Sequence, residues 1–355
     1  MKKILFDARS LGKKPSGIGI YVYNMSKALA KDKDISLSLI CDVALSDEIK
    51  ELKDSGLKIY EYGKEISKSI SLYSYYKFVQ KCIDEEKPDV FWEGNNLVPI
   101  KIKNPYGKLI ATIHDVFPVS HPQYYGKVYP LFFRYGLKKT IKNFDGFIYN
   151  SFDTKEEAEK YFPELKGRSN AVGYIIVPRL PKREITDNNS FLYIGNLEKR
   201  KGTDILLKAY KEYKENGGSK SLRLAGKVRE DDIQALMDEV SNSVSGLEYL
   251  GYVSEEGKSN EYAACSAFLF PSKLEGFGIP VIEAMDYYKP IIASDLKIFK
   301  EIAGDNLKYI DHNVASLCNA MQEELPSVDK IKYDETINKY SEESIIKITK
   351  DYLCK

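Results

Sequence analysis

The sequence predicts an α/β protein with two doubly wound domains, each a parallel sheet covered by helices on both faces. Short continuous apolar runs alternate with longer amphipathic stretches along the chain, as expected for parallel strands that are buried on both faces. Several runs end in a turn or a glycine and lead into helical periodicity. The length of 355 residues suits two domains better than one.

Nine apolar runs are the expected strands, five in the first half of the chain and four in the second. They are Ile4–Asp7, Ser36–Cys41, Asp89–Trp92, Leu109–Ile113, Gly146–Tyr149, Phe191–Ile194, Ser221–Ala225, Ala267–Phe270 and Pro290–Ala293.

The alternation pauses at a segment with two prolines and a polar cluster, which we interpret as a linker. We expect an N-terminal, acceptor-side domain over 1–177, the linker over 178–189 and a C-terminal, ligand-binding domain over 190–340. Residues 341–355 are expected to form a helix that packs back on the N-terminal domain. Ligands of doubly wound sheets bind outside the carboxyl ends of the strands, so two such domains facing each other would form a central cleft.

Composition excludes several classes of function. Lys and Arg number 53 against 52 for Asp and Glu, a net charge of +1, which gives no argument for a nucleic-acid partner. The five cysteines are scattered without CxxC spacing, so free thiols in a reducing cytoplasm fit better than disulfides or zinc. We expect no signal peptide, no membrane span, no bound metal and no cofactor.

The loop after Ile4–Asp7 is the first candidate ligand contact. It leads into a helical pattern that runs to Leu29, and Gly17 and Gly19 would let the backbone approach a ligand closely. The helix start offers free N–H groups to an anion. A purely structural strand-to-helix turn is the alternative, because paired glycines are common.

His114 lies directly at the carboxyl end of an expected strand, within the sequence T-I-H-D. It is the only one of the three histidines with that placement. A lone histidine is more often structural, but this position favours contact with a substrate.

The segment Gly195–Gly202 carries three consecutive cations and opens a helix over Asp204–Tyr213. Cations at a helix N-terminus are disfavoured by the helix dipole. A bound diphosphate would satisfy both the cations and the helix N–H groups, with Arg200 binding bidentately and Lys201 acting as a point charge. A solvated run of charges is the alternative.

The segment Glu275–Glu283, E-G-F-G-I-P-V-I-E, gives the strongest signal. It follows a buried strand, its glycines keep the loop free of side-chain bulk, and Pro280 suits the first turn of a helix that runs toward Met285. The two glutamates could face one pocket, one binding sugar hydroxyls and the other ribose hydroxyls.

A stretch that mixes aromatic residues and cations covers 124–142, Y-Y-G-K-V-Y-P-L-F-F-R-Y-G-L-K-K-T-I-K. Such stretches suit a membrane surface or a lipid-linked acceptor. In the alternative interpretation Phe132, Phe133 and Leu137 pack into the first domain and the cations are solvated.

Seven segments in order resemble glycosyltransferase family 4, retaining enzymes of GT-B architecture with two Rossmann-like domains. Asn196 stands where many members carry Arg, and Arg200 beside Lys201 resembles the mannosyltransferase-like branch. The segments are FDARSL…SGIGIY, TIHDVFP, YNSFDTKEEA, YIGNLEKRKG, LRLAGK, YLGYVS and FLFPSKLEGFGIPVIEAM.

The resemblance implies four catalytic residues. Glu275 would contact the donor sugar near the reaction centre and His114 would lie near the same sugar, while Arg200 and Lys201 would neutralise the diphosphate leaving group.

The resemblance also implies a donor-binding set. Loop backbone N–H groups would bind sugar hydroxyls and diphosphate, Glu283 would hold the ribose, and the segment at 252–253 would meet the nucleobase. The set is Gly17, Gly19, Gly195, Tyr252, Val253, Gly276, Phe277, Gly278 and Glu283.

The expected function is therefore a retaining, metal-independent hexosyltransferase of surface polysaccharide synthesis. GDP-mannose is the first-choice donor, and a glycan or lipid-linked saccharide is the acceptor. The protein is expected in the cytoplasm, with peripheral contact to the inner face of the membrane. The alternatives are a UDP- or dTDP-sugar donor such as one carrying glucose or rhamnose, another GT-B nucleotide-sugar enzyme such as an epimerase, and a silent nucleotide-sugar binder.

Overall fold

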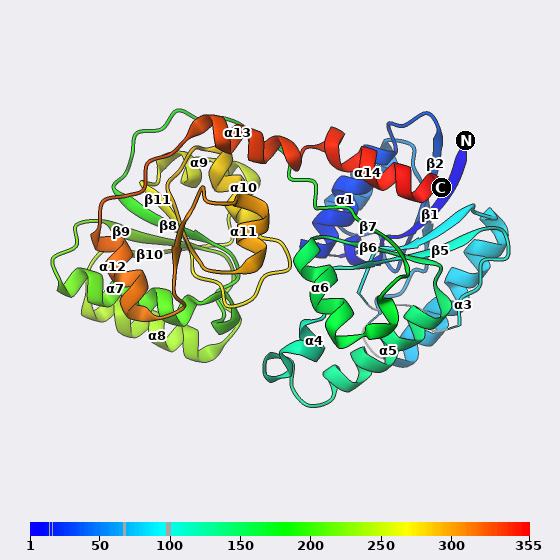
Figure 1. Ribbon diagram of the computed structural model, residues 1–355, viewed down its shortest axis with the longest axis horizontal. Helices are drawn as coiled ribbons and strands as arrows, with labels where there is room; N and C mark the ends of the chain where they lie inside the picture. Colours follow the sequence, from blue (N-terminus) through cyan, green and yellow to red (C-terminus); the bar gives the residue numbers. More distant parts are fainter. Residues whose placement is uncertain (14, 16, 67–68, 97–100) are drawn as a thin grey trace. The chain divides into compact units, whose positions relative to one another are not determined.

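The computed structural model describes residues 1–13, 15, 17–66, 69–96 and 101–355, and the chain divides into two compact units. The first unit comprises Met1–Ile176 together with Tyr340–Lys355, and the second comprises Val177–Lys339. Each unit contains one parallel sheet with helices packed around it (Figure 1). The predicted α/β class with two parallel-sheet domains is confirmed.

The sheet of the first unit has the strand order β3-β2-β1-β4-β5-β6-β7. The order reverses between β1 and β4, so the ligand-binding crevice of such a sheet is expected at the carboxyl ends of these two strands. The strands are β1 (Lys2–Asp7), β2 (Ile35–Cys41), β3 (Lys58–Glu61), β4 (Val90–Glu93), β5 (Lys108–Ile113), β6 (Gly146–Tyr149) and β7 (Ser169–Val172).

The sheet of the second unit has the order β10-β9-β8-β11-β12-β13 and reverses between β8 and β11. Its strands are β8 (Ser190–Ile194), β9 (Ser221–Ala225), β10 (Leu247–Gly251), β11 (Ala267–Phe270), β12 (Ile291–Ser294) and β13 (Lys308–Ile310).

Helices connect most successive strands in both units. Those of the first unit are α1 (Gly17–Leu29), α2 (Asp47–Asp54), α3 (Ser69–Glu86), α4 (Phe117–Ser120), α5 (Tyr129–Asn143), α6 (Phe152–Tyr161) and α14 (Glu342–Cys354). Those of the second unit are α7 (Thr203–Glu215), α8 (Asp231–Ser243), α9 (Glu255–Ala264), α10 (Ile279–Asp286), α11 (Lys297–Ala303), α12 (Val314–Gln322) and α13 (Lys330–Lys339). Short 3-10 helices are η1 (Arg9–Leu11), η2 (Pro122–Tyr124), η3 (Pro163–Leu165) and η4 (Lys199–Lys201).

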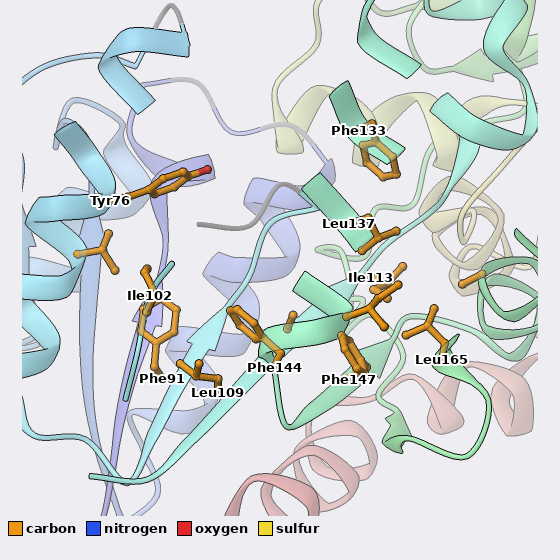
Figure 2. Close-up of a cluster of buried hydrophobic side chains, with 14 of the residues drawn as sticks. Tyr76, Phe91, Ile102, Leu109, Ile113, Phe133, Leu137, Phe144, Phe147 and Leu165 are labelled. Atoms are coloured by element: carbon orange, nitrogen blue, oxygen red, sulfur yellow. The ribbon is translucent and has the colours of Figure 1, made fainter. Parts of the chain in front are cut away.

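The two faces of the first sheet pack differently. Figure 2 shows the core on one face, a cluster that includes Phe91 and Phe147 from the strands and Phe133 and Leu137 from α5. On the other face Phe6 and Trp92 stack with ring centroids 4.0 Å apart. α1 and α14 lie side by side in this unit (Figure 1).

The segment 178–189 contains neither helix nor strand and makes ion pairs within the second unit. The Arg179 guanidinium lies 2.5 Å from Asp286 Oδ1, and Lys182 Nζ lies 3.0 Å from the same oxygen. Among the helices that the structure describes, none combines the length and apolar character needed to cross a bilayer.

Candidate functional site

The loops that leave β8 and β11 are packed against each other at the reversal point of the second sheet. Gly202, which ends η4, has φ 71°, and a Cβ at this position would lie 1.9 Å from the carbonyl oxygen of Pro271. Glycine is therefore required both by the backbone conformation and by the close approach. The contact holds the cationic loop against the loop that carries Glu275.

Lys201 and Glu275 form an ion pair at this place. Lys201 Nζ lies 2.5 Å from Glu275 Oε1, and the Ser272 hydroxyl donates to the same oxygen at 2.8 Å. The side chains of Lys201 and Glu275 are 17% and 8% exposed. Two of the predicted catalytic residues are thus in direct contact.

Arg200 joins the same two loops. Its guanidinium donates to the backbone oxygen of Leu274 at 3.2 Å and to Glu198 Oε1 at 2.6 Å. Lys199, the remaining cation of the run, pairs with Asp232. Each of the three cations therefore has a carboxylate partner in this structure, which lowers the electrostatic cost that the sequence suggested at this helix N-terminus.

The helix α10 begins after Gly278, whose φ is 111°, and Pro280 lies in its first turn as predicted. Glu283 on this helix is buried and bonded on both oxygens, since Lys258 Nζ lies 2.8 Å from Oε1 and the Tyr262 hydroxyl donates to Oε2 at 2.9 Å. Burial would lower the pKa of Lys258, but the Glu283 and Glu255 carboxylates raise it above its usual value. A cation and a phenol thus fix the orientation of the Glu283 carboxylate.

The remaining predicted donor residues of the second unit lie in loops that follow its strands. Gly195 follows β8 and packs closely on Gly226, since a Cβ on Gly226 would lie 1.8 Å from the Gly195 carbonyl oxygen. Tyr252 follows β10, is 77% exposed, and has Lys227 Nζ 5.5 Å from its ring centroid. Val253 is partly exposed beside it, whereas Phe277 is buried.

Gly17 and Gly19 differ in their surroundings. Gly17 is the first residue of α1, and a Cβ there would meet nothing within 4 Å. A Cβ on Gly19 would lie 2.7 Å from the Ser10 carbonyl oxygen, so this glycine lets α1 pack against its own preceding loop. Ser16, part of the predicted loop, lies outside the described residues.

His114 follows β5 and is only 4% exposed. Its Nε2 lies 2.9 Å from the Gly94 carbonyl oxygen, and its ring meets the edge of Tyr21 at 4.8 Å between centroids. Burial lowers its pKa to about 4, and the bond to Gly94 only partly opposes this. The imidazole is therefore neutral near pH 7. Because a carbonyl can only accept, Nε2 carries the proton and Nδ1 is the acceptor nitrogen.

A charged cluster that the sequence did not predict lies at the reversal point of the first sheet. The Arg9 guanidinium donates to Glu93 Oε1 at 3.1 Å, and its Nε lies 3.7 Å from Asp7 Oδ2. The carboxylates of Asp7 and Glu93 are fully buried. The sequence feature that could have predicted this cluster is that Asp7 and Glu93 each come at the end of an apolar run. Lys258 and Tyr262 were also missed, because they lie in a helix without an evident motif.

Comparison with known families gives matches over both units. Residues 15–168 match the model described as Glycosyltransferase Family 4, and residues 179–324 match the model described as Glycosyl transferases group 1.

Relatives with similar sequences cover most of the chain. O-antigen chain mannosyltransferase B of Escherichia coli is 26% identical over 327 residues, 85% of each chain. O-antigen chain mannosyltransferase RfbU of Salmonella typhimurium is 24% identical over 324 residues, covering 87% of this chain and 86% of the relative.

Solved structures share the fold over the full length. Anabaena Alr3699/HepE in complex with UDP and glucose superposes with a TM-score of 0.72 at 16% identity, covering all of both chains. TarM superposes with a TM-score of 0.75 at 13% identity, covering 100% of this chain and 99% of that one. On the two family matches and this shared fold, the chain belongs to glycosyltransferase family 4 and has the GT-B architecture.

Proposed function

We propose that this chain is a retaining, metal-independent hexosyltransferase that transfers mannose from GDP-mannose to a glycan or lipid-linked saccharide in surface polysaccharide synthesis. The observation that carries the proposal is the Lys201–Glu275 ion pair at the reversal point of the second sheet, with Arg200 bound to the same loop. It places two cations and a carboxylate where a doubly wound sheet binds its ligand.

The proposed catalytic task is stabilisation of the departing nucleoside diphosphate. An arriving diphosphate competes with Glu275 for Lys201, because both are anions within reach of one ammonium group. Glu275 is then released to accept hydrogen bonds from donor-sugar hydroxyls, and Lys201 with Arg200 meets the charge that develops on the leaving group. A leaving phosphate oxygen would deprotonate the acceptor hydroxyl on the same face of the sugar. The acceptor then attacks from the face that the diphosphate leaves, so the anomeric configuration is retained.

The proposed roles of Glu283 and His114 follow from the fixed orientation of the first and the neutral charge of the second. Glu283 is held by Lys258 and Tyr262, so its carboxylate is oriented in advance to accept from ribose hydroxyls. His114 is neutral, so we assign it a hydrogen bond to the donor sugar through Nδ1 and no general-acid role at neutral pH.

A panel of GDP-mannose, UDP-glucose and dTDP-rhamnose tests the donor, scored by slow donor hydrolysis and by thermal shift. GDP-mannose is expected to give the fastest hydrolysis and the largest shift, in keeping with the two mannosyltransferase relatives. Preference for UDP-glucose would reassign the donor, and the Anabaena neighbour bound to UDP and glucose is the reason to include it. A thermal shift with neither hydrolysis nor transfer would indicate a silent binder.

The variant Glu275→Ala tests the proposed mechanism. Transfer should fall by roughly 10²–10³-fold or more, as when a positioned transition-state contact is removed, while GDP affinity is largely preserved. Glu324→Gln, an exposed glutamate in the same unit, is the matched control and should transfer normally. A fully active Glu275→Ala protein would remove Glu275 from the mechanism, and an anomerically inverted product would refute retention.

We further propose that the surface around α5 touches the membrane. Phe133 and Leu137 belong to the core, so for them the packing interpretation is right. Val128, Leu131 and Tyr135 are 79%, 70% and 55% exposed. Exposed cations lie among them, namely Lys127, Arg134, Lys138 and Lys142. An apolar surface mixed with lysine and arginine is suited to anionic lipid.

Flotation with phosphatidylglycerol vesicles tests this surface. The double variant Val128→Ser, Leu131→Ser should weaken vesicle binding by about 100-fold, because each of the two lost apolar side chains contributes roughly 1.5 kcal/mol when buried in lipid. Ile331→Ser, which is 73% exposed on α13, is the matched control and should float like the wild type. Failure of the wild-type protein to float would end the membrane proposal without affecting the donor assignment.

A further inference from the structure

The carboxyl ends of β1 and β4 bring two acids together inside the first unit. Asp7 and Glu93 are paired residues in the register of these parallel strands, so their side chains extend from the same face of the sheet. Leu5 and Phe91, two residues earlier on each strand, lie in the core of that face. Both acidic side chains are fully buried.

On each of the two acids, one carboxylate oxygen accepts two or more hydrogen bonds. Asp7 Oδ1 accepts from the Tyr75 hydroxyl at 2.9 Å and from the backbone N–H of Arg9 at 3.1 Å. Glu93 Oε1 accepts from the backbone and side-chain N–H groups of Asn95, at 3.0 and 2.8 Å, and from Arg9 Nη2.

Within the described part of the chain, the second carboxylate oxygen of each acid lacks a hydrogen-bond donor. Among the described residues, Asp7 Oδ2 and Glu93 Oε2 are buried and receive no hydrogen bond. A buried acceptor without a donor is costly, and two ionised carboxylates against one guanidinium would leave a net buried charge of −1. Tyr75 and Tyr76 from α3 are neutral, since burial raises both pKa values, and Asp42 after β2 adds further negative charge.

We propose that Asp7 and Glu93 share one proton between Oδ2 and Oε2, and that the resulting neutral cluster with Arg9 positions His114. One proton supplies the missing donor to both oxygens and balances the charge. Burial raises the pKa of Glu93 well above its usual value, the charge of Asp7 raises it further, and Arg9 opposes both. Two carboxyl groups in one buried site cannot both ionise without a large cost, which favours a single shared proton.

The connection to His114 runs through four consecutive residues. Glu93 fixes Asn95 by two hydrogen bonds, Gly94 between them accepts from His114 Nε2, and Asn96 Oδ1 accepts from the His114 backbone N–H at 2.8 Å. Asp7 and Glu93 are therefore positioning residues. This second half of the inference rests on the role proposed above for His114, whereas the shared proton does not.

The variant Glu93→Gln tests the proton by stability alone. The amide oxygen keeps the bonds from Asn95 and Arg9, and the amide N–H replaces the shared proton without titrating. In the wild type the folded pKa of Glu93 is raised, so the stabilising effect of the proton is complete below about pH 4.5 and is lost as pH rises through the raised pKa.

Above pH 4.5 the unfolding equilibrium constant of the wild type should therefore rise, relative to Glu93→Gln, by about tenfold per pH unit until the raised pKa is reached. Urea titrations at pH 5, 7 and 9 measure this. Glu343→Gln, an exposed glutamate of α14 in the same unit, should follow the wild type. A Glu93→Gln protein with the wild-type pH dependence would overturn the shared proton.

Two further measurements test the shared proton if the Glu93→Gln protein fails to fold. Asp7→Asn can donate from its amide to an ionised Glu93 and should give the same loss of pH dependence. In wild-type protein labelled at side-chain carboxyl carbons, one acidic carbon should keep its protonated chemical shift at pH 7. Its absence would refute the proposal without any variant.

The proposed positioning of His114 by the cluster has its own spectroscopic test. The chain has three histidines, so imidazole ¹⁵N spectra can be assigned by single substitutions. Glu93→Gln should leave the His114 signals and the Nε2–H tautomer in place, whereas Glu93→Ala should shift them and leave His312 unchanged. Unmoved His114 signals in Glu93→Ala would refute positioning. Shifted His114 signals in a Glu93→Ala protein that keeps full transfer activity would count against the proposed role of His114 alone.

Discussion

At the scale of single residues, burial decides the charge of His114. Its folded pKa of about 4 lies below the usual 6.5, so as pH falls the unfolded chain takes up the proton first and the folded state loses stability. The stabilisation is complete above pH 6.5 and is lost toward pH 4. Over this window the loss amounts to about 3 kcal/mol at 1.4 kcal/mol per pH unit.

The variant His114→Gln, which can still donate to Gly94, should lack this loss. Urea unfolding at pH 7 and pH 4.5 measures the difference, and His121→Gln, at a partly exposed histidine, serves as the control. Equal acid sensitivity of the wild type and His114→Gln would show that His114 is accessible to protons in the folded state.

Gly202 is constrained both by its positive φ and by its contact with Pro271. Gly202→Ala combines an unfavourable positive φ, costing roughly 1–2 kcal/mol, with a clash against Pro271 that adds about 1–3 kcal/mol. Gly217→Ala has φ 86° and open space around its Cβ, so it isolates the cost of φ alone. Urea denaturation should show the larger loss for Gly202→Ala, and equal losses would mean that the two loops can separate freely.

At the scale of elements, the nine predicted strands are all present, and among the described residues four further strands appear, β3, β7, β10 and β13. These four are the edges of the two sheets. Central strands are buried on both faces and therefore read as continuous apolar runs. Edge strands such as Lys58–Glu61 and Leu247–Gly251 are partly exposed, so their sequences lack that signal.

The same limit applies to the site. The sequence places Arg200, Lys201 and Glu275 in loops at strand ends, because topology brings such loops together. It does not specify that Lys258 faces Glu283, since that contact depends on how α9 and α10 pack around β11. Helix packing depends on side-chain fit between segments, which periodicity does not encode.

The C-terminal helix α14 belongs to the first unit although α13 before it belongs to the second. Ile345, Thr349 and Leu353 are its buried residues. Leu353→Ala should reduce the free energy of unfolding of the first unit by about 2–5 kcal/mol, as for other buried leucines. A loss of this size would mean that burial of α14 is a large part of the stability of that unit.

Lys350→Ala on the same helix is the control. It removes ion pairs with Asp32 and Asp34 that lie at the solvent-exposed surface, so the expected loss of stability is small. Thermal unfolding of both variants measures the contrast. If the two losses are equal, α14 is held by its surface charges and not by apolar burial.

At the scale of the whole molecule, the chain passes between the two units twice, after Ile176 and after Lys339. Arg179 lies just beyond the first passage and binds both Asp286 and, at 3.2 Å, Asn338 just before the second. The two connecting segments are therefore tied to each other inside the second unit. Each unit has its own sheet and core, so each should respond to a ligand in its own way.

Nucleotide binding tests this separation. Arg200, Lys201 and Glu283, the proposed nucleotide contacts, all lie in the second unit, so GDP at 100 times its Kd should stabilise that unit by about 2.7 kcal/mol. Amides of β8 and β11 that exchange by global unfolding should then exchange roughly 100-fold more slowly, and those of β1 and β4 much less. Hydrogen exchange followed by peptide mass spectrometry resolves the two sheets. Lys201→Met should abolish the protection, and protection confined to the first unit would place the nucleotide site there instead.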